Sequence, residues 1–228
     1  MERSRINAII DEAIAFVNGR GMPLPRFARW SPGDWAAAGD DCREIIDNML
    51  GWDVTDFGSG DFVKTGLTIF TFRNGNILRP ESYPKPYAEK MLLVGERQDM
   101  PYHFHWKKME DIINRGGGNL LVTLYNSDRE GGFAGTDVHV TMDGRKVVVP
   151  AGGTVRLEPG DSITLLPGQY HNWISEEGTG KVMLFEVSSP NDDNVDNRFY
   201  EDIARLPEII EDEPARYLLF KDYGKLAV

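Results

Sequence analysis

Apolar residues recur at helical spacing near the start of the chain. Between Ser4 and Gly19, the apolar positions three or four residues apart are Ile6, Ile9, Ile10, Ala13, Ile14 and Val17. This pattern predicts an amphipathic helix with Ser4 as its N-cap and Gly19 at its end. The helix would pack its apolar stripe against the rest of the protein.

A second helical stretch is predicted to begin at SPGD, residues 31–34. Ser31 is a suitable N-cap, Pro32 fits the first helical position and Asp34 fits the third. Apolar positions continue at helical spacing until Gly51, which ends the helical region.

From Trp52 the pattern changes to short runs rich in Val, Ile, Thr, Phe and Tyr, separated by Gly, Asn, Asp and Pro. The runs are GLTIFTFRNG (66–75), YAEKMLLVG (87–95), MPYHFHW (100–106), NLLVTLYN (119–126), TDVHVTMDGRKVVVPAGGTVRLEPGDSITLLPG (136–168) and KVMLFEVSS (181–189). Short strands with turns at roughly 8 to 12-residue intervals indicate an antiparallel sandwich or barrel. The sequence shows no helical segment between them that is long enough for a βαβ crossover.

After Asp192 the sequence becomes polar and acidic, and the run EIIEDEPARYLLFKDYG (208–224) follows. Its apolar residues predict a segment that packs back on the barrel. We interpret residues 1–228 as a single domain with a helical N-terminal extension at 1–51, a β-barrel core at 52–190 and a C-terminal extension at 191–228. The sequence contains no internal repeat and no low-complexity linker.

Composition restricts the ligand and the location. The 228 residues carry a net charge of -11, with a pI of about 4.9, which argues against a nucleic-acid partner and favours a small, weakly charged ligand. No secretory signal and no apolar window long enough to span a membrane are found. The single cysteine, Cys42, cannot form an internal disulfide. A cytoplasmic location is therefore expected, with no membrane partner.

The stretch HFHWKKME contains the first candidate metal ligands. On a strand, His103 and His105 point to the same face, and a turn can bring Glu110 to the same centre. Two histidines in this spacing are more often ordinary surface or core residues. His171 follows the turn at Pro167 about sixty residues later, where it can reach the barrel interior as a fourth ligand.

The two stretches resemble the two cupin motifs. HFHWKKMEDIINRGG is similar to the first motif, with His103, His105, Glu110 and Gly117 in its positions, and GDSITLLPGQYH is similar to the second motif, ending in His171. The resemblance implies a cupin β-barrel, a double-stranded β-helix of jelly-roll type, in which these three histidines and the glutamate bind one metal ion.

The match departs from the cupin pattern at three places. Arg97 stands where the first motif begins with Gly, although Gly95 is close by; Pro167 falls one residue late, after Leu166; and Ser175 replaces a trailing Asn. These positions affect the shape of turns and leave the ligands intact.

Three histidines and one carboxylate leave two open positions on an octahedral metal. This suits Mn²⁺, Fe²⁺, Co²⁺ or Ni²⁺ better than a closed structural Zn²⁺ site, and open positions imply a substrate. His139, the fourth histidine, lies on a predicted hairpin strand, where we expect it to face solvent without a role.

Lysines and tail carboxylates are further candidates. Lys90 shares a strand face with Leu92 and Val94, so it either reaches water at the sheet end or is a charged group inside the barrel. Lys107 and Lys108 are either a solvated pair or contacts to a substrate hydroxyl. The candidates in the tail are Glu211, Glu213 and Arg216, which form either a solvated acidic turn or a source of a proton-transferring carboxylate.

The resemblance to the D-lyxose isomerase family covers nearly the whole chain. The segments that carry it are GWDVTDFGSGDF, GLTIFTFRNG, YAEK, HFHWKKMEDIINRGGGNL, EVSSPNDDN and EDEPA. The resemblance implies a homodimeric aldose–ketose isomerase that uses a divalent metal, usually Mn²⁺, to interconvert D-lyxose with D-xylulose and D-mannose with D-fructose.

Isomerisation moves a proton between C2 and C1 of an open-chain sugar through a cis-enediol. Lys90 and Lys108 are expected to contact and polarise the sugar oxygens, with Arg216 as a further contact. The proton carrier is Glu110 or a tail carboxylate, Glu211 or Glu213, and a hydride shift is an alternative route. The competing functions are an Fe-dependent cupin dioxygenase and a non-catalytic sugar-binding cupin.

Overall fold

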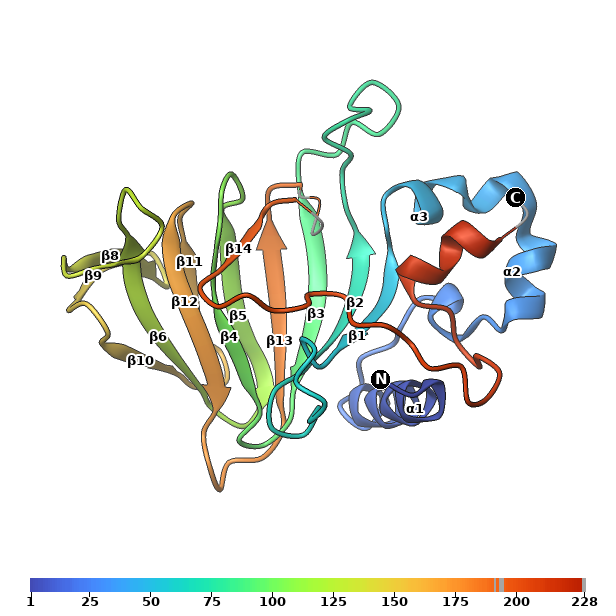
Figure 1. Ribbon diagram of the computed structural model, residues 1–228, viewed down its shortest axis with the longest axis horizontal. Helices are drawn as coiled ribbons and strands as arrows, with labels where there is room; N and C mark the ends of the chain where they lie inside the picture. Colours follow the sequence, from blue (N-terminus) through green and yellow to red (C-terminus); the bar gives the residue numbers. More distant parts are fainter. Residues whose placement is uncertain (191, 193–194, 227–228) are drawn as a thin grey trace.

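The computed structural model describes residues 1–190, 192 and 195–226. Three α-helices precede the strands: α1 (Arg3–Asn18), α2 (Pro32–Ala38) and α3 (Arg43–Asp47). Short 3₁₀ helices are η1 (Arg26–Arg29), η2 (Gly39–Cys42) and η3 (Phe220–Lys225). Figure 1 shows the helices gathered at one end of the molecule, beside two curved β-sheets.

The strands form two sheets whose neighbouring strands are antiparallel. The eight-stranded sheet has the order β1 (Gly51–Thr55), β2 (Leu67–Arg73), β3 (Ala88–Val94), β13 (Val182–Ser188), β5 (Glu110–Gly117), β11 (Ser162–Leu165), β8 (Val138–Met142) and β9 (Arg145–Val149). The six-stranded sheet has the order β10 (Thr154–Leu157), β6 (Leu120–Ser127), β12 (Gln169–Ser175), β4 (Asp99–His105) and β14 (Asn197–Phe199), and β7 (Phe133–Ala134) pairs with β6. The predicted antiparallel β architecture is confirmed.

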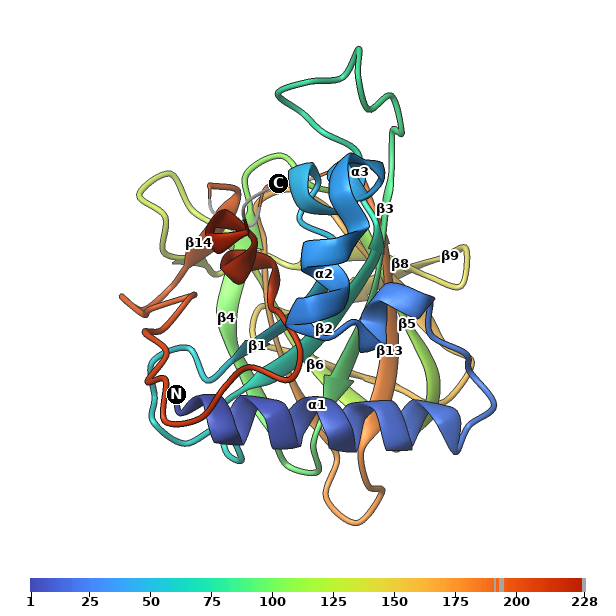
Figure 2. The ribbon, with the colours of Figure 1, turned by 90° about the vertical axis from the view of Figure 1, so that its right-hand side faces the viewer.

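Strand β3 is buried on both faces. Leu92 and Val94 point into the core between the two sheets, whereas Met91 and Leu93 belong to the cluster under helix α1. This explains why the run AEKMLLV lacks a clean polar and apolar alternation, because a strand covered on both sides is apolar throughout. Figure 2 shows α1 crossing below the strands of this sheet.

The helix signals were correct at one start and wrong at the other. Ser31 and Asp34 form the predicted capping box at the start of α2. Helix α1 instead begins at Arg3 with Glu2 at the N-cap, and the backbone N–H of Ser4 donates to Asp212 Oδ1 at 2.9 Å. A tail carboxylate thus binds one of the first-turn N–H groups that have no partner within the helix.

The C-terminal segment packs between the helices and the outer edge of the barrel. Leu219 forms a bridge with Trp52 of β1, and the Tyr223 hydroxyl donates to the Leu50 carbonyl at 2.8 Å. The segment therefore contacts the barrel at β1, while most of its apolar residues pack on helices. In the described part of the chain, the helices are too short or too polar to cross a membrane.

Candidate metal centre and active site

Strand pairing brings the four candidate ligands together. His171 of β12 lies directly opposite His103 of β4, and His105 is two residues further along the same strand. The ligand nitrogens of these three histidines lie within 4.8 Å of one another. Glu110 is the first residue of β5, and its Oε1 is 3.3 Å from His105 Nε2 and 3.2 Å from His171 Nε2.

Backbone carbonyls set the orientation of two of the imidazole rings. The Nδ1 of His103 is 3.0 Å from the Pro101 carbonyl, and the Nδ1 of His171 is 3.0 Å from the Gln169 carbonyl. Because a carbonyl only accepts, each Nδ1 carries the proton, and each Nε2 presents a lone pair to the centre. This second interaction is typical of metal-binding histidines.

Two atoms that face each other at this centre lack protons. Among the described residues, Glu110 Oε1 and His171 Nε2 are buried without a hydrogen-bond partner. A lone pair on nitrogen therefore faces a carboxylate oxygen at 3.2 Å, an arrangement that is unfavourable unless a cation lies between them. The three-histidine group and Glu110 fit a divalent metal ion.

Burial and neighbouring charges favour the protonation states that bind metal. Burial lowers the pKa of His103 well below its usual value, with a further contribution from His171, and burial together with Lys108 lowers the pKa of His105. Burial alone would raise the pKa of Glu110, but Lys108 and His105 hold that pKa well below its usual range. These shifts favour neutral His103 and His105 and an ionised Glu110.

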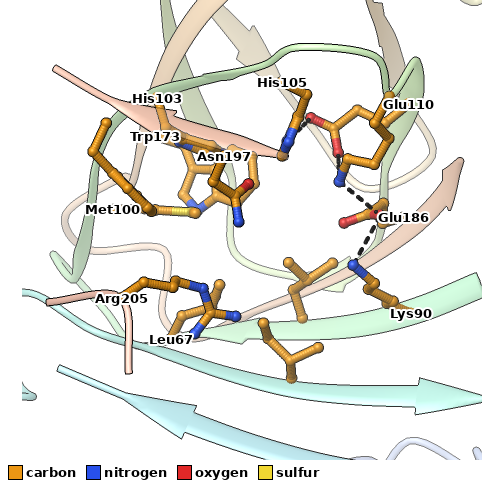
Figure 3. Close-up of a pocket in the computed structure, with 14 residues that line it drawn as sticks. Leu67, Lys90, Met100, His103, His105, Glu110, Trp173, Glu186, Asn197 and Arg205 are labelled. Carbon is orange, nitrogen blue, oxygen red and sulfur yellow. Dashed lines mark hydrogen bonds and ion pairs between the residues drawn. The ribbon is translucent and has the colours of Figure 1, made fainter. Parts of the chain in front are cut away.

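A chain of buried charges continues from the metal centre. Lys108 Nζ is 2.6 Å from Glu110 Oε2 and 2.9 Å from Glu186 Oε1, and Lys90 Nζ is 3.5 Å from the same Glu186 oxygen. The Ser188 hydroxyl also donates to that oxygen at 2.9 Å. Figure 3 shows the other Glu186 oxygen directed into the cavity. Two lysines thus fix a carboxylate next to the metal centre.

Three of the candidate ligands, His103, His105 and Glu110, line one narrow cavity together with the charged chain, and this cavity opens to solvent. Its remaining lining is apolar or carries nitrogen donors: Leu67, Ile69, Leu92, Met100, Trp173, Asn197, Phe199 and Arg205. The cavity therefore combines a reactive end with walls that can bind a small polar molecule.

Comparisons with known proteins decide the family. The D-lyxose isomerase family model matches residues 1–223. D-lyxose/D-mannose isomerases of Serratia proteamaculans and Escherichia coli O157:H7 are each 46% identical to this chain over 224 residues, which is 98% of the chain and 98% of each relative. The chain belongs to the D-lyxose isomerase family. It is an aldose–ketose isomerase.

Solved structures with the same fold include L-ribose isomerases. That of Geodermatophilus obscurus has a TM-score of 0.61 at 14% identity, and that of Acinetobacter sp. DL28 in complex with L-ribose has a TM-score of 0.58 at 15% identity. Each comparison covers 92% of this chain and 98% of the other. At such low identity the similarity shows the shared fold, which is the predicted cupin-type barrel.

Lys90 and Lys108 are buried, whereas Lys107 in the same turn is exposed. Lys90 is 3% exposed, which resolves its two interpretations in favour of a charge inside the barrel, and Lys108 is also buried. Lys107 is exposed, and its backbone N–H donates to Asp196. His139 faces solvent on β8, as expected.

The tail residues expected at the site lie elsewhere in this isomerase. Glu211 accepts two hydrogen bonds of 2.9 Å from Arg3, Glu213 accepts from Asn7 at 2.6 Å, and Arg216 pairs with Asp11. None of these three tail residues appears in the described lining of the cavity. The reason is that helix α1 buries the Arg3 guanidinium, and this charge requires carboxylate partners that the acidic tail supplies.

The departures from the cupin motif leave the turns intact. Arg97 has a φ of 59°, the left-handed conformation that Gly adopts most easily, so an arginine occupies a backbone position that suits glycine. Ser175 is buried and donates to the Gly180 carbonyl at 2.9 Å. The ligands on β4 and β12 keep their register beside these positions.

Sequence reasoning did not single out Glu186, Trp173, Asn197 or Arg205. A signal for Glu186 was present, because it alternates with Leu184 on the buried face of β13, where a charged residue is unusual. Asn197 and Arg205 lie in the tail, and the local pattern there did not indicate that the chain returns to the cavity.

Proposed function

We propose that this isomerase interconverts D-lyxose with D-xylulose and D-mannose with D-fructose. The observation that carries the proposal is the cavity that joins the His103, His105, Glu110 and His171 cluster to the Lys108–Glu186–Lys90 chain. The relatives named D-lyxose/D-mannose isomerase, at 46% identity over nearly the whole chain, support the substrate class. An oxidation requiring O₂ and a purely binding role do not account for the buried proton-transfer groups.

The three histidines and Glu110 would hold a divalent metal ion, for which we propose Mn²⁺, with Co²⁺, Fe²⁺, Ni²⁺ and Zn²⁺ as alternatives. Bound there, a divalent cation supplies Lewis acidity for the negative charge that develops on the sugar oxygens. Two backbone carbonyls orient the rings of His103 and His171, so these ligands are held in place before the ion arrives.

Glu186 is the proton carrier that the geometry favours. Its carboxylate is 3% exposed, and one of its oxygens faces the cavity while Lys108 and Lys90 hold the other. A carboxylate fixed in this way can take the proton from C2 and return it to C1 on the same face of the sugar. Glu110 is a weaker base because it is also a metal ligand and pairs with Lys108 at 2.6 Å.

The lysines have complementary tasks. Lys90 and Lys108 are ammonium donors next to the carboxylate that moves the proton, and both line the cavity. They are placed to donate hydrogen bonds to the oxygens on C1 and C2, whose negative charge increases as the C2 proton leaves. Glu186 therefore takes the proton-carrying role that was expected of the tail carboxylates, and Lys90 and Lys108 contact the sugar oxygens as expected.

Anaerobic turnover tests the proposal. The purified protein is loaded with Mn²⁺ and incubated with D-lyxose, and with D-mannose, in the absence of oxygen. We expect D-xylulose and D-fructose as products. D-lyxose deuterated at C2 separates the two routes, since proton transfer through Glu186 loses deuterium to water and a hydride shift retains it at C1. Absence of ketose from both sugars would refute the proposed function.

We further propose that the enzyme is a homodimer and acts in the cytoplasm. Light scattering coupled to size-exclusion chromatography measures the mass of the assembly, and fractionation of the native cell tests the location. A monomeric mass would refute the dimer without affecting the chemistry proposed for the cavity.

A further inference from the structure

Arg205 lines the cavity on the side away from Lys90 and Glu186, and it belongs to a buried ion pair. Arg205 Nη2 donates to Asp53 Oδ2 at 2.7 Å, and the Arg205 carbonyl accepts from Thr55 Oγ1 at 2.8 Å. The two side chains are 13% and 4% exposed. Asp53 and Thr55 both belong to β1, so this edge strand fixes the tail arginine at the cavity.

Apolar side chains cover part of this pair, and Lys221 is a charged neighbour of both residues. Leu67 and Ile69 of β2 line the same cavity, and the Phe57 ring centroid is 5.9 Å from the Arg205 guanidinium carbon. Removing two charges from water costs several kcal/mol per ion in such surroundings, and a buried pair often contributes little net stability. The pair is therefore better explained by a ligand that the guanidinium contacts than by stability.

A second donor lines the same cavity. Trp173 is 2% exposed, and within the described part of the chain its Nε1 has no hydrogen-bond partner. Its ring stacks on His171, with centroids 5.6 Å apart and an interplanar angle of 26°. A buried N–H without an acceptor is unfavourable, so this group points to an oxygen that arrives with the ligand.

Figure 3 shows how the cavity is divided. Trp173 and Arg205 lie on one side, and Lys90 and Glu186 lie on the other. An open-chain sugar with C1 and C2 at Glu186 extends its remaining carbons toward the opposite side. Hydroxyl oxygens accept hydrogen bonds, and both Trp173 and Arg205 offer N–H donors.

We propose that Arg205 and Trp173 form the subsite for the sugar hydroxyls beyond C3, and that Asp53 is the positioning residue for Arg205. This inference rests on the proposed isomerase function, because it assumes that the reacting carbons lie at Glu186. The subsite gives the enzyme its affinity for pentoses and hexoses, while the proton transfer occurs at Glu186 on the facing side of the cavity.

Three variants test the subsite, all measured on the Mn²⁺-loaded full chain. Arg205→Lys and Trp173→Phe remove or alter one donor and keep much of the side-chain volume, and Asp53→Asn removes the charge that holds Arg205. We expect the KM for D-lyxose and D-mannose to rise about tenfold or more, with kcat changed less than about threefold. Arg198→Lys is the matched control, since Arg198 does not appear in the described lining of the cavity.

A shortened sugar separates ligand contact from general damage to the site. L-glyceraldehyde keeps the C2 configuration of D-lyxose and has no hydroxyl beyond C3. Its inhibition constant, measured in competition with D-lyxose, should be nearly the same for the wild type and the Arg205→Lys and Asp53→Asn variants. A merely structural role would raise the constant for L-glyceraldehyde and the KM for D-lyxose by the same factor.

The outcomes distinguish this inference from the proposed function. Unchanged KM values in the variants, or equal losses for the short and the long sugar, would overturn the subsite while leaving the isomerase activity intact. Failure of the wild-type enzyme to form any ketose would instead refute the proposed function. Metal content and the melting temperature are measured for each variant, because a loss of either would identify damage to the fold.

Discussion

His171 contributes an unprotonated nitrogen that faces a carboxylate, and this single contact defines the metal centre. Replacement with alanine removes a ligand whose Nδ1 proton is already bound to the Gln169 carbonyl. We expect His171→Ala to lose bound Mn²⁺ and activity together, because three remaining ligands bind a labile divalent ion far more weakly. Metal analysis by mass spectrometry and a ketose assay measure both quantities.

The control for that variant is another histidine of the same chain. His139 is exposed on β8, so His139→Ala should keep both metal and activity. Full turnover by His171→Ala without bound metal would show that the centre has been assigned incorrectly.

Glu186 is a second test at the scale of one residue. Glu186→Gln keeps the side-chain size but removes the charge that pairs with Lys108 and Lys90. We expect a turnover loss on the order of 10²–10⁴-fold, the usual contribution of a positioned acid or base, with the metal retained. Glu89→Gln on strand β3 is the control, because Glu89 pairs with Arg73 outside the cavity. A Glu186→Gln enzyme that still exchanges the C2 proton with solvent at the wild-type rate contradicts the assignment.

The turn before β4 shows how an element keeps its shape with an unusual residue. Arg97 has a φ of 59°, a conformation that costs a non-glycine residue about 1 kcal/mol or more. Its ion pair with Glu177 is exposed and contributes little. We therefore expect Arg97→Gly to raise the free energy of unfolding by up to about 1 kcal/mol, less the added entropy of the unfolded chain.

Urea unfolding of Arg97→Gly and of Glu177→Gln separates the backbone term from the ion pair. The second variant removes the pair and leaves the backbone unchanged, so it should lie within about 0.5 kcal/mol of the wild type. If Arg97→Gly is destabilised more than Glu177→Gln, strain at this turn is not the governing factor. Metal affinity should be unaffected in both.

The elements that could be predicted from the sequence are those whose three-dimensional contacts follow from the local pattern of residues. The spacing of His103, His105 and Glu110 predicted two ligands on one strand and a third just after the following turn, and His171 followed from the second motif. The tail illustrates the opposite case. Its Glu211 pairs with Arg3, 208 positions away in the chain. Its Arg205 is held at the cavity by Asp53, 152 positions away. Such long-range contacts depend on three-dimensional packing that no local periodicity records.

At the scale of the whole molecule, one buried arginine joins the two ends of the chain. Arg3 of helix α1 donates to Glu211 and to Asp222 at 2.9 Å, and Asp222 is also buried. Next to these carboxylates in the chain, the Ile210 carbonyl accepts from the Arg3 backbone N–H, and Leu219 forms a bridge with Trp52 of β1. The closure of α1 against the tail therefore depends on the ionised state of carboxylates.

This dependence predicts how stability changes with pH. The hydrogen bonds from Arg3 lower the pKa of Glu211 from 4.5 to about 2. Because the pKa is lower in the folded state, the pair stabilises the fold above about pH 4.5, and this contribution is lost as the pH falls toward 2. Glu211 is half exposed, so the effect at neutral pH is at most about 1 kcal/mol.

Urea unfolding of the wild type and of Glu211→Gln, followed from pH 6 to pH 2, measures this contribution. The wild type should be the more stable at pH 6, and the difference should shrink as the pH falls below about 4.5, because both proteins then approach the same neutral side chain. Glu201→Gln, a change at an exposed position of the same tail, controls for the removal of one negative charge from an acidic protein. A difference between wild type and Glu211→Gln that stays constant down to pH 2 would mean that packing around Arg3, and not the ionised carboxylate, holds the tail against α1.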